Sequence, residues 1–214
     1  GFVMTDYTLV SKFRFSGGVR IEQAKLFTDI FLFDSLGLAK DDKRRFYDSS
    51  QPLANPGQLS EVSILPSANL IFKIKEVENE QMNLRAGFSQ TVARPSLREL
   101  SDVSVFDYEL RAPVFGNSEL KMVRIDNYDL RFENYFKNND NVSVSVFYKN
   151  FKNHIELVNS NGYTWVNVDK SNVMGIELEG RKSITKNFEF RANLTLVKSQ
   201  TEFVRNRIEF SDGP

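Results

Sequence analysis

The chain has 214 residues, with 28 basic and 28 acidic side chains and a formal net charge of zero. This balance gives no electrostatic basis for nucleic-acid binding, which favours a basic patch or stripe. With no cysteine and a single histidine, the sequence excludes disulfides, thiol catalysis, thiolate metal sites and multi-histidine zinc sites. We find no catalytic set of residues and expect no enzyme activity, no cofactor, no metal and no nucleic-acid partner.

No apolar run approaches the 18 or more residues of a membrane helix; the longest runs, such as residues 30–33, are short. A membrane β-barrel is compatible with this hydropathy, because its strands alternate apolar and polar residues. Phenylalanine occurs 19 times, and aromatic enrichment is typical of strands and of barrel interfaces. The chain begins at Gly1 and ends at Pro214, and we expect both ends to be cut from a longer protein.

The first alternating segment begins at Phe13 and is predicted to continue to about Phe33. Its apolar face comprises Phe13, Phe15, Gly17, Val19 and Ile21, and its polar face comprises Arg14, Ser16, Gly18, Arg20 and Glu22. Successive strand side chains point to opposite faces, so this pattern predicts a two-faced strand. The length exceeds the usual 3–10 residues and suits a tilted strand that crosses a bilayer.

Further alternating segments follow at residues 62–75, 83–93, 127–136, 142–149, 174–181 and 188–196, and residues 208–210 begin another. Short turns are predicted at 76–81, 138–141 and 183–187, and long connections at 35–60, 94–121 and 150–172. We read 150–172 as a strand extension tipped by a turn. Alternation of short and long connections is typical of outer-membrane barrels, and a soluble sandwich does not require it. The sequence therefore predicts an all-β antiparallel meander of about ten strands without a helix, part of a transmembrane β-barrel.

The polar faces of these segments carry full charges of both signs, which cannot face a dry core. They can line a wide, wet lumen while the apolar faces meet lipid. The predicted lumen-facing residues are Arg85, Arg131, Glu133, Glu177, Glu179 and Arg191. An antiparallel soluble sheet with one solvated face would show the same pattern.

A set of short motifs in a fixed order adds a family resemblance. In chain order they are Leu65-Pro66-Ser67-Ala68-Asn69-Leu70, Leu84-Arg85-Ala86-Gly87-Phe88-Ser89, Thr91-Val92-Ala93-Arg94-Pro95-Ser96, Gly116-Asn117-Ser118-Glu119-Leu120-Lys121, Asn127-Tyr128-Asp129-Leu130, Phe147-Tyr148-Lys149 and Val173-Met174-Gly175-Ile176-Glu177-Leu178-Glu179. Over roughly residues 12–210 the chain resembles TonB-dependent outer-membrane receptors, most closely the Bacteroidetes-type form. At Ser118 the family often has proline, which changes the stiffness of the loop.

The resemblance implies a 22-stranded barrel with an N-terminal plug domain, in the outer membrane of a Gram-negative bacterium. It implies energised import of a scarce small-molecule ligand, such as a siderophore, a vitamin or an oligosaccharide. The partners would be outer-membrane lipid and the TonB complex, which the N-terminal part engages. We find neither plug, TonB-box segment nor closing strand in the sequence, so residues 1–214 are expected to be the C-terminal part of the barrel domain.

The ligand-contacting loop residues predicted from the sequence are Arg94, Arg98, Asn117, His154, Tyr163 and Trp165. For several of them a structural role is the alternative. Pro95 would end a strand while Arg94 pairs with a nearby acid. His154 would be a lone exposed loop histidine. Tyr163 and Trp165 would pack at the membrane rim or in a loop.

Glu177 and Glu179 lie two residues apart on one strand and so share a face. A carboxylate pair could serve acid–base or cation chemistry. The alternative is a pair of lumen charges balanced by Arg181 and Arg191. Gly17-Gly18 lacks the Lys-Ser/Thr ending and the following helix of a phosphate loop, so we read it as a bend or a close approach of strands.

A second class of function remains open, namely a soluble or surface-exposed β-rich module that binds glycans. A receptor barrel would differ from it in an outward apolar band about 25 Å tall. Part of a barrel would also have two open edges with unpaired backbone groups, which cannot remain in hydrocarbon. We therefore expect the isolated chain to self-associate through these edges.

Overall fold

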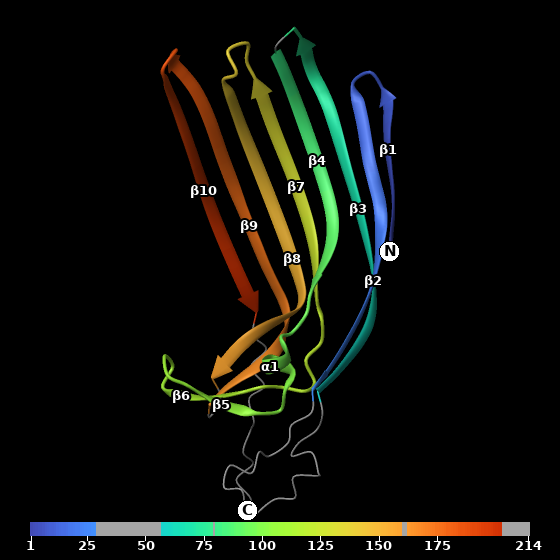
Figure 1. Cartoon of the computed structure of the whole chain (residues 1–214), viewed down its shortest axis with the longest axis vertical. Coiled ribbons are helices and arrows are strands. Elements are labelled where there is room, and N and C mark those ends of the chain that lie inside the picture. The colour runs from blue at the N-terminus through green and yellow to red at the C-terminus, as the bar shows by residue number, and fades with distance from the viewer. Residues whose placement is uncertain (29–56, 79, 160–161, 203–214) are drawn as a thin grey trace, which may run out of the picture.

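The computed structural model of the chain describes residues 1–28, 57–78, 80–159 and 162–202, and these form one ten-stranded sheet (Figure 1). Eight strands make up its wall: β1 (Phe2–Val10), β2 (Phe13–Thr28), β3 (Gly57–Val77), β4 (Glu80–Ala93), β7 (Val123–Tyr135), β8 (Asn141–Asn159), β9 (Tyr163–Thr185) and β10 (Phe188–Glu202). Each pairs antiparallel with the next along the chain. The predicted all-β antiparallel meander is confirmed.

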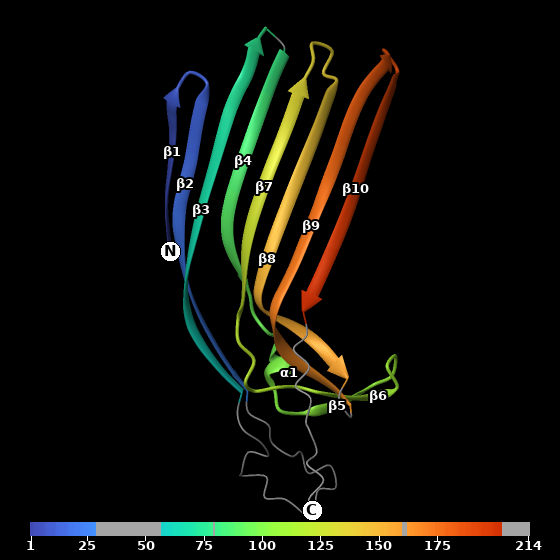
Figure 2. The same ribbon diagram turned by 180° about the vertical axis from the view of Figure 1, so that it is seen from behind.

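The connection between β4 and β7 is not the irregular loop that the sequence suggests. It contains a one-turn helix, α1 (Leu97–Leu100), and a hairpin of β5 (Ser104–Asp107) and β6 (Ala112–Phe115), all gathered at one end of the sheet (Figures 1 and 2). β6 pairs parallel with the start of β9. The expectation of no helix is therefore wrong at this point. In the described residues no helix has the length and hydropathy needed to cross a membrane.

Strand boundaries differ from the sequence expectations at β1 and at the start of β3. β1 was not expected, and β3 begins at Gly57, so residues 57–60 of the expected loop 35–60 are strand. Residues 29–56 and the expected strand at 208–210 lie outside the described residues. The expected strand extension over 150–172 is confirmed, because β8 and β9 stay paired as far as Asn159 and Tyr163, and β9 reaches 23 residues. Residues 160–161 of the predicted turn at its tip lie outside the described residues.

Cross-strand register gathers the apolar side chains into continuous rows. Two neighbouring rows consist of Phe13, Phe72, Leu84, Phe132, Val144, Leu178 and Leu194, and of Phe15, Leu70, Ala86, Leu130, Val146, Ile176 and Leu196. These side chains are exposed or half-buried, with 48% exposure at Leu130, 44% at Ile176 and 59% at Leu196. We call this apolar side the outer face. An exposed apolar face of this extent indicates contact with a partner or with lipid.

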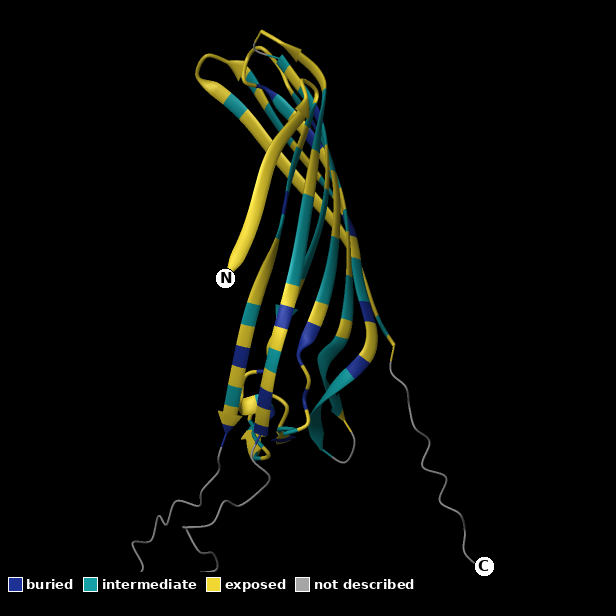
Figure 3. Ribbon diagram, turned by 90° about the vertical axis from the view of Figure 1, so that its right-hand side faces the viewer, coloured by how far each residue is buried: buried dark blue, intermediate teal, exposed yellow. Residues whose placement is uncertain are grey.

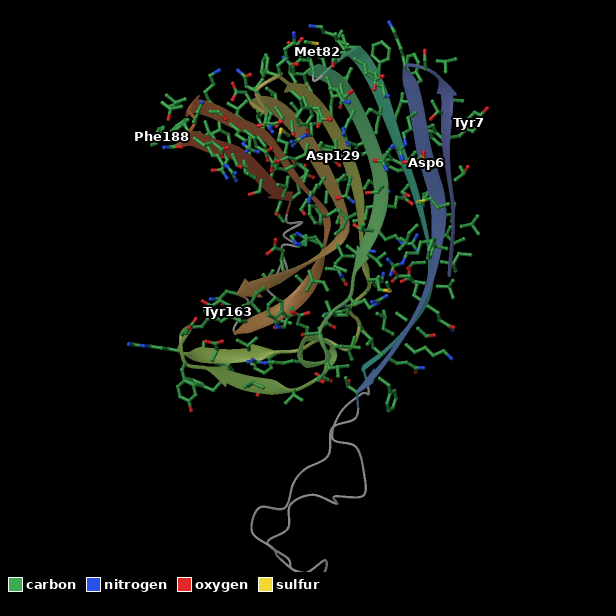
Figure 4. All side chains as sticks on the ribbon, turned by 45° about the horizontal axis from the view of Figure 1, so that its top comes forward. Asp6, Tyr7, Met82, Asp129, Tyr163 and Phe188 are labelled. Atoms are coloured by element: carbon green, nitrogen blue, oxygen red, sulfur yellow. The ribbon has the colours of Figure 1, made fainter. Side chains whose placement is uncertain are left out.

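The opposite side of the sheet is polar and more shielded, and we call it the inner face. Glu133 is only 3% exposed, Ser143 6% and Asn83 7%. The sheet forms an open arc (Figure 4), and side chains on the concave side of an arc crowd one another, which accounts for this burial. Along β2, β3, β4, β7, β8 and β9 exposed positions are interspersed with buried and half-buried ones, whereas β1 and β10 are exposed almost throughout (Figure 3).

Among the described residues, the one hydrophobic core cluster lies at the end of the sheet that carries α1. It consists of Ala24, Leu59, Leu100, Leu120 and Met122. Pairing between β3 and β4 stops at Ser67 and Ser89, after which β2 and β3 continue together and β4 continues with β7. The core cluster packs at this divergence, and β4 Val92 packs against it.

Candidate functional site

The centre of the inner face is a hydrogen-bonded network around Glu133 on β7. Arg85 on β4 donates from Nε to Glu133 Oε1 at 2.6 Å, and Asn83 Nδ2 donates to the same oxygen at 3.2 Å. Arg131 Nε lies 3.4 Å from Oε2. Arg85 and Arg131 are direct cross-strand partners, an arrangement in which like charges repel. The Glu133 carboxylate between them removes that repulsion.

Arg131 extends the network across the next two strands. Its Nη2 donates to Glu179 Oε2 on β9 at 2.8 Å, and its Nη1 donates to Ser145 Oγ on β8 at 3.2 Å. Ser143 Oγ donates to the same Glu179 oxygen at 3.1 Å. Charged side chains from β4, β7 and β9 are thus joined into one network on a single face.

The predicted partners of the carboxylate pair are wrong. Glu179 is neutralised by Arg131, whereas Arg181 and Arg191 both donate to Glu189 on β10, Arg181 Nε at 2.8 Å. Register explains the difference: Glu179 lies opposite Ser143 on β8, next to Ser145, and the long Arg131 side chain reaches across from β7. Glu177 faces Ser145 and Thr195 on the same side of the sheet.

All six residues predicted to face a lumen therefore lie on the inner face, which the register of their strands establishes. Five of the six, all but Glu177, form ion pairs with described residues. In the described part of the chain, three or more His, Asp or Glu side chains never come together as a metal site. The inner face is suited to contact water and polar solutes.

Two ion pairs span the divergence of β3 and β4. Arg94, just beyond β4, contacts Glu22 on β2, with 2.5 Å between Nη2 and Oε2. Arg124 on β7 contacts Glu61 on β3, with 2.5 Å between Nη2 and Oε1. The alternative reading of Arg94 as the partner of a nearby acid is confirmed, and β4 ends at Ala93, two residues before Pro95. Whether Arg94 also contacts a ligand stays a prediction.

α1 is fixed at its start by a capping box and at its end by burial. Ser96 accepts a hydrogen bond from the backbone N–H of Glu99, and the Glu99 carboxylate accepts from the Ser96 N–H at 2.8 Å. Leu100 is fully buried in the core cluster. This reciprocal cap satisfies two N–H groups that a helix start leaves without partners.

We expect Ser96→Ala to loosen α1 by about 1 kcal/mol, the usual cost of losing a cap. Hydrogen exchange at the Leu100 and Ser101 amides, which close the turn, should become about fivefold faster. Arg98→Ala, at an exposed position of the same turn, is the control. Exchange rates that Ser96→Ala leaves unchanged would show that burial of Leu100 alone holds the helix.

Gly116 and Asn117 connect the returning chain to α1 and to β9. A Cβ on Gly116 would lie 1.8 Å from the Ser101 carbonyl oxygen, so only glycine permits this close approach. Asn117 Nδ2 donates to the Trp165 carbonyl oxygen at 3.0 Å. The Trp165 ring packs against the core cluster, and Tyr163 lies at the junction with β6. The structure thus brings Asn117, Tyr163 and Trp165 together at this end of the sheet.

His154 lies within β8, and so the reading as an exposed loop histidine is wrong. Its Nδ1 is 2.8 Å from the buried Ser171 Oγ and 3.3 Å from Glu156 Oε1, and its ring lies beside Phe151. Both contacts involve the same ring nitrogen, whereas a catalytic relay needs one partner at each nitrogen. Arg98 is exposed on α1. A ligand contact by either residue stays a prediction.

Sequence reasoning missed an aromatic pair at the tip of the β5–β6 hairpin. Phe106 and Tyr108 meet edge to face with ring centroids 5.2 Å apart, and Tyr108 is 85% exposed. Arg111 beside them adopts a left-handed backbone with φ of 51°. The signal available was Phe106-Asp107-Tyr108 inside a long polar connection, because exposed aromatic residues in such loops often contact ligands.

At the opposite end of the sheet, Asp140 closes the turn between β7 and β8. Lys182 Nζ donates to its Oδ2 at 2.6 Å and the Ser183 N–H donates to its Oδ1 at 2.7 Å. The Lys182 ammonium and then the Ser183 N–H hold the pKa of Asp140 below the ordinary 3.8. A lowered pKa stabilises the fold above the unfolded pKa, and this contribution is lost as pH falls towards the folded pKa.

Asp140→Asn is therefore expected to lower the free energy of unfolding at pH 7. The difference between wild type and variant should shrink as pH falls below the unfolded pKa, because the wild-type carboxyl then becomes protonated. Urea unfolding at pH 7 and pH 3 measures both values. Glu78→Gln, in the neighbouring short turn, is the control; a difference that is the same at both pH values would contradict the assigned role of the Asp140 charge.

A family model described as "TonB dependent receptor-like, beta-barrel" matches residues 1–212, and no curated protein matches the chain. The siderophore receptor PirA from Pseudomonas aeruginosa aligns with 94% of the chain at a TM-score of 0.63 and 16% identity, over 31% of PirA. The alcaligin outer-membrane receptor FauA from Bordetella pertussis aligns with 94% of the chain at a TM-score of 0.58 and 14% identity, over 29% of FauA. A double mutant of the hemophore receptor HasR from Serratia marcescens aligns with 94% of the chain at a TM-score of 0.60 and 15% identity, over 33% of HasR.

At these identities the structural likeness shows the fold. A curved antiparallel sheet with a charged inner face and an exposed apolar outer face is the wall of a membrane β-barrel. Because the family model covers nearly the whole sequence, the chain belongs to the TonB-dependent receptor-like β-barrel family of Gram-negative outer-membrane proteins. It spans about a third of the length of the solved receptors that it matches.

Proposed function

We propose that the chain is one section of the barrel wall of an outer-membrane receptor that imports a scarce small-molecule ligand, with energy delivered through TonB. The observation that carries this proposal is the apolar outer face, which stays in register across strands from β2 to β10. The plug domain, the closing strands and the segment that contacts TonB belong, in this proposal, to parts of the protein outside this chain.

The end with α1, β5 and β6 would be extracellular, because long connections face outwards in such barrels and short turns face the periplasm. Arg85, Arg131, Glu133, Glu177, Glu179 and Arg191 would then line the lumen. Tyr163, Trp165, Arg98 and the hairpin aromatics Phe106 and Tyr108 would lie at its mouth, where ligand first binds. Siderophores are the first ligand class to test, since PirA is named a siderophore receptor; vitamins and oligosaccharides are the next.

Uptake by cells that carry or lack the full-length receptor tests the proposal. Labelled ferric siderophores, cobalamin and oligosaccharides are supplied with and without a protonophore. We expect receptor-dependent accumulation of one class, abolished when the protonophore removes the energy for TonB. Receptor-dependent binding that persists at the surface, with no accumulation and no protonophore effect, would contradict import and favour a glycan-binding surface module.

β1 and β10 end the described sheet, and each has only one neighbour along its transmembrane part. In the complete receptor these edges would pair with the flanking strands of the barrel. The isolated chain is expected to associate with copies of itself, because unpaired edge groups cannot remain in hydrocarbon. Light scattering in detergent measures this, and a stable monomer of the isolated chain would contradict it.

A further inference from the structure

The outer face contains a depression near the short turns that the barrel wall does not require. It has a volume of about 580 Å³ and lies between the β7–β8 turn and β10. Its floor is formed by two small residues in direct register, Gly180 on β9 and Ala192 on β10. A Cβ on Gly180 would meet no atom within 4 Å, so the space above it is open. The volume falls within the range of about 300–1,000 Å³ usual for small-molecule sites.

Apolar side chains wall the depression and remain exposed. They are Phe136 at 44% exposure, Val142 at 41% and Phe190 at 55%. The depression is therefore continuous with the apolar outer face, and an apolar group that enters from that side stays out of water. Beneath the depression β8 pairs with β9 and β9 pairs with β10, whose outer edge has no partner strand among the described residues.

Cations lie at the turn end of the same depression. Lys137 and Lys182 both line it. Lys182 Nζ is paired with Asp140, and the neighbouring Glu80 is paired with Lys75, in each case at 2.6 Å. Among the described residues, Lys137 has no carboxylate oxygen within the 4.0 Å of an ion pair. The site thus combines an apolar groove with a surplus positive charge at one end.

We propose that this depression binds one glycerophospholipid of the periplasmic leaflet. One acyl chain lies over Gly180 and Ala192, between Phe136 and Phe190, and the phosphate lies at Lys137 and Lys182. The charge matches an anionic headgroup, and a Lys near a membrane surface strengthens such binding about fivefold. This inference rests on the membrane position of the outer face and does not depend on import.

Native mass spectrometry of the full-length receptor tests the proposal, with 1-palmitoyl-2-oleoyl-phosphatidylglycerol titrated into detergent solution. Gly180→Leu and Ala192→Leu fill the groove and should each reduce lipid binding about tenfold, since the displaced chain loses its apolar contacts. Ala86→Leu, on the outer face away from the groove, is the matched control and should bind as wild type. Folding of every variant is checked by heat-modifiable electrophoretic mobility.

Lys137→Gln removes only a charge from an exposed turn, so it keeps the test informative if a groove variant fails to fold. It should weaken phosphatidylglycerol binding about fivefold and leave binding of the uncharged dioleoylglycerol unchanged. Undiminished phosphatidylglycerol binding in the folded groove variants or in Lys137→Gln would overturn the proposal. An equal loss in Ala86→Leu, or a protein co-purifying on the groove in place of lipid, would also overturn it. Energised uptake is measured on the same variants, so failure of lipid binding is distinguished from failure of import.

Discussion

Ile176→Arg is expected to lower the free energy of unfolding of the full-length receptor in phospholipid vesicles by about 2–4 kcal/mol, the cost of a charge at mid-membrane on a lipid-facing strand. Ile176 lies on the outer face between Val146 and Leu196, in the middle of the apolar rows. Thr195→Arg places the same side chain on the inner face of the neighbouring strand, opposite Glu177. There it meets water and a carboxylate, and a change within about 0.5 kcal/mol is expected.

Urea unfolding of the two variants in vesicles provides the comparison. Ile176 is 44% exposed, so in a water-soluble sheet arginine would be tolerated there as on any solvated surface. Equal and small effects of Ile176→Arg and Thr195→Arg would therefore contradict a lipid-facing outer face. A large loss of unfolding free energy in Ile176→Arg but not in Thr195→Arg would indicate that the outer face contacts hydrocarbon.

The second large effect is expected at Glu133. Glu133→Gln removes the charge that separates Arg85 from Arg131 and weakens the hydrogen bonds of both guanidinium groups. A hydrogen bond to a charged group contributes about 1.5–3 kcal/mol, and removal of one member of a buried ion pair costs about 3–5 kcal/mol. Arg85 is 47% exposed and Arg131 32%, so water screens part of this loss. We expect about 2–3 kcal/mol.

Urea unfolding in detergent measures this value, and Glu177→Gln is the matched control on the same face. No described residue forms an ion pair with Glu177, so its loss should change stability by no more than about 0.5 kcal/mol. If both glutamines cost the same small amount, the network around Glu133 would contribute nothing beyond ordinary solvated charges.

The two faces of the sheet could be predicted from the sequence because side-chain alternation is a local property. Val142, Val144 and Val146 lie on the outer face and Ser143 and Ser145 on the inner face, as their spacing alone requires. The turn between β7 and β8 could also be predicted from the sequence, because asparagine and aspartate favour turns. Asn139 in this turn adopts a positive φ of 58°.

The partners of the inner-face charges could not be predicted, because they depend on register between strands far apart in sequence. Arg181 lies only two residues from Glu179 along the chain, yet Arg131 on β7 is the residue that pairs with it. The pairing of β6 with β9 could not be predicted for the same reason, because its two register pairs join residues about fifty positions apart in the sequence.

The helix in the long connection was within reach of the sequence. Ser96 followed by Glu99 is the spacing of a capping box, and Leu100 after it supplies the apolar anchor. One turn is too short to show helical periodicity, so the polar composition of residues 94–121 predicts a loop. The need for glycine at position 116 could not be predicted, because its cause is the close approach of the chain to the Ser101 carbonyl oxygen in the folded structure.

Site-directed spin labelling along β8 distinguishes a face of the sheet that meets lipid from one that meets water. The chain has no cysteine, so single cysteines at 142–147 report individual positions once any cysteine elsewhere in the full-length receptor is replaced. In vesicles we expect oxygen accessibility to peak at 142, 144 and 146, and accessibility to a water-soluble nickel chelate to peak at 143, 145 and 147. High nickel accessibility at all six positions would contradict a barrel wall and indicate a soluble sheet.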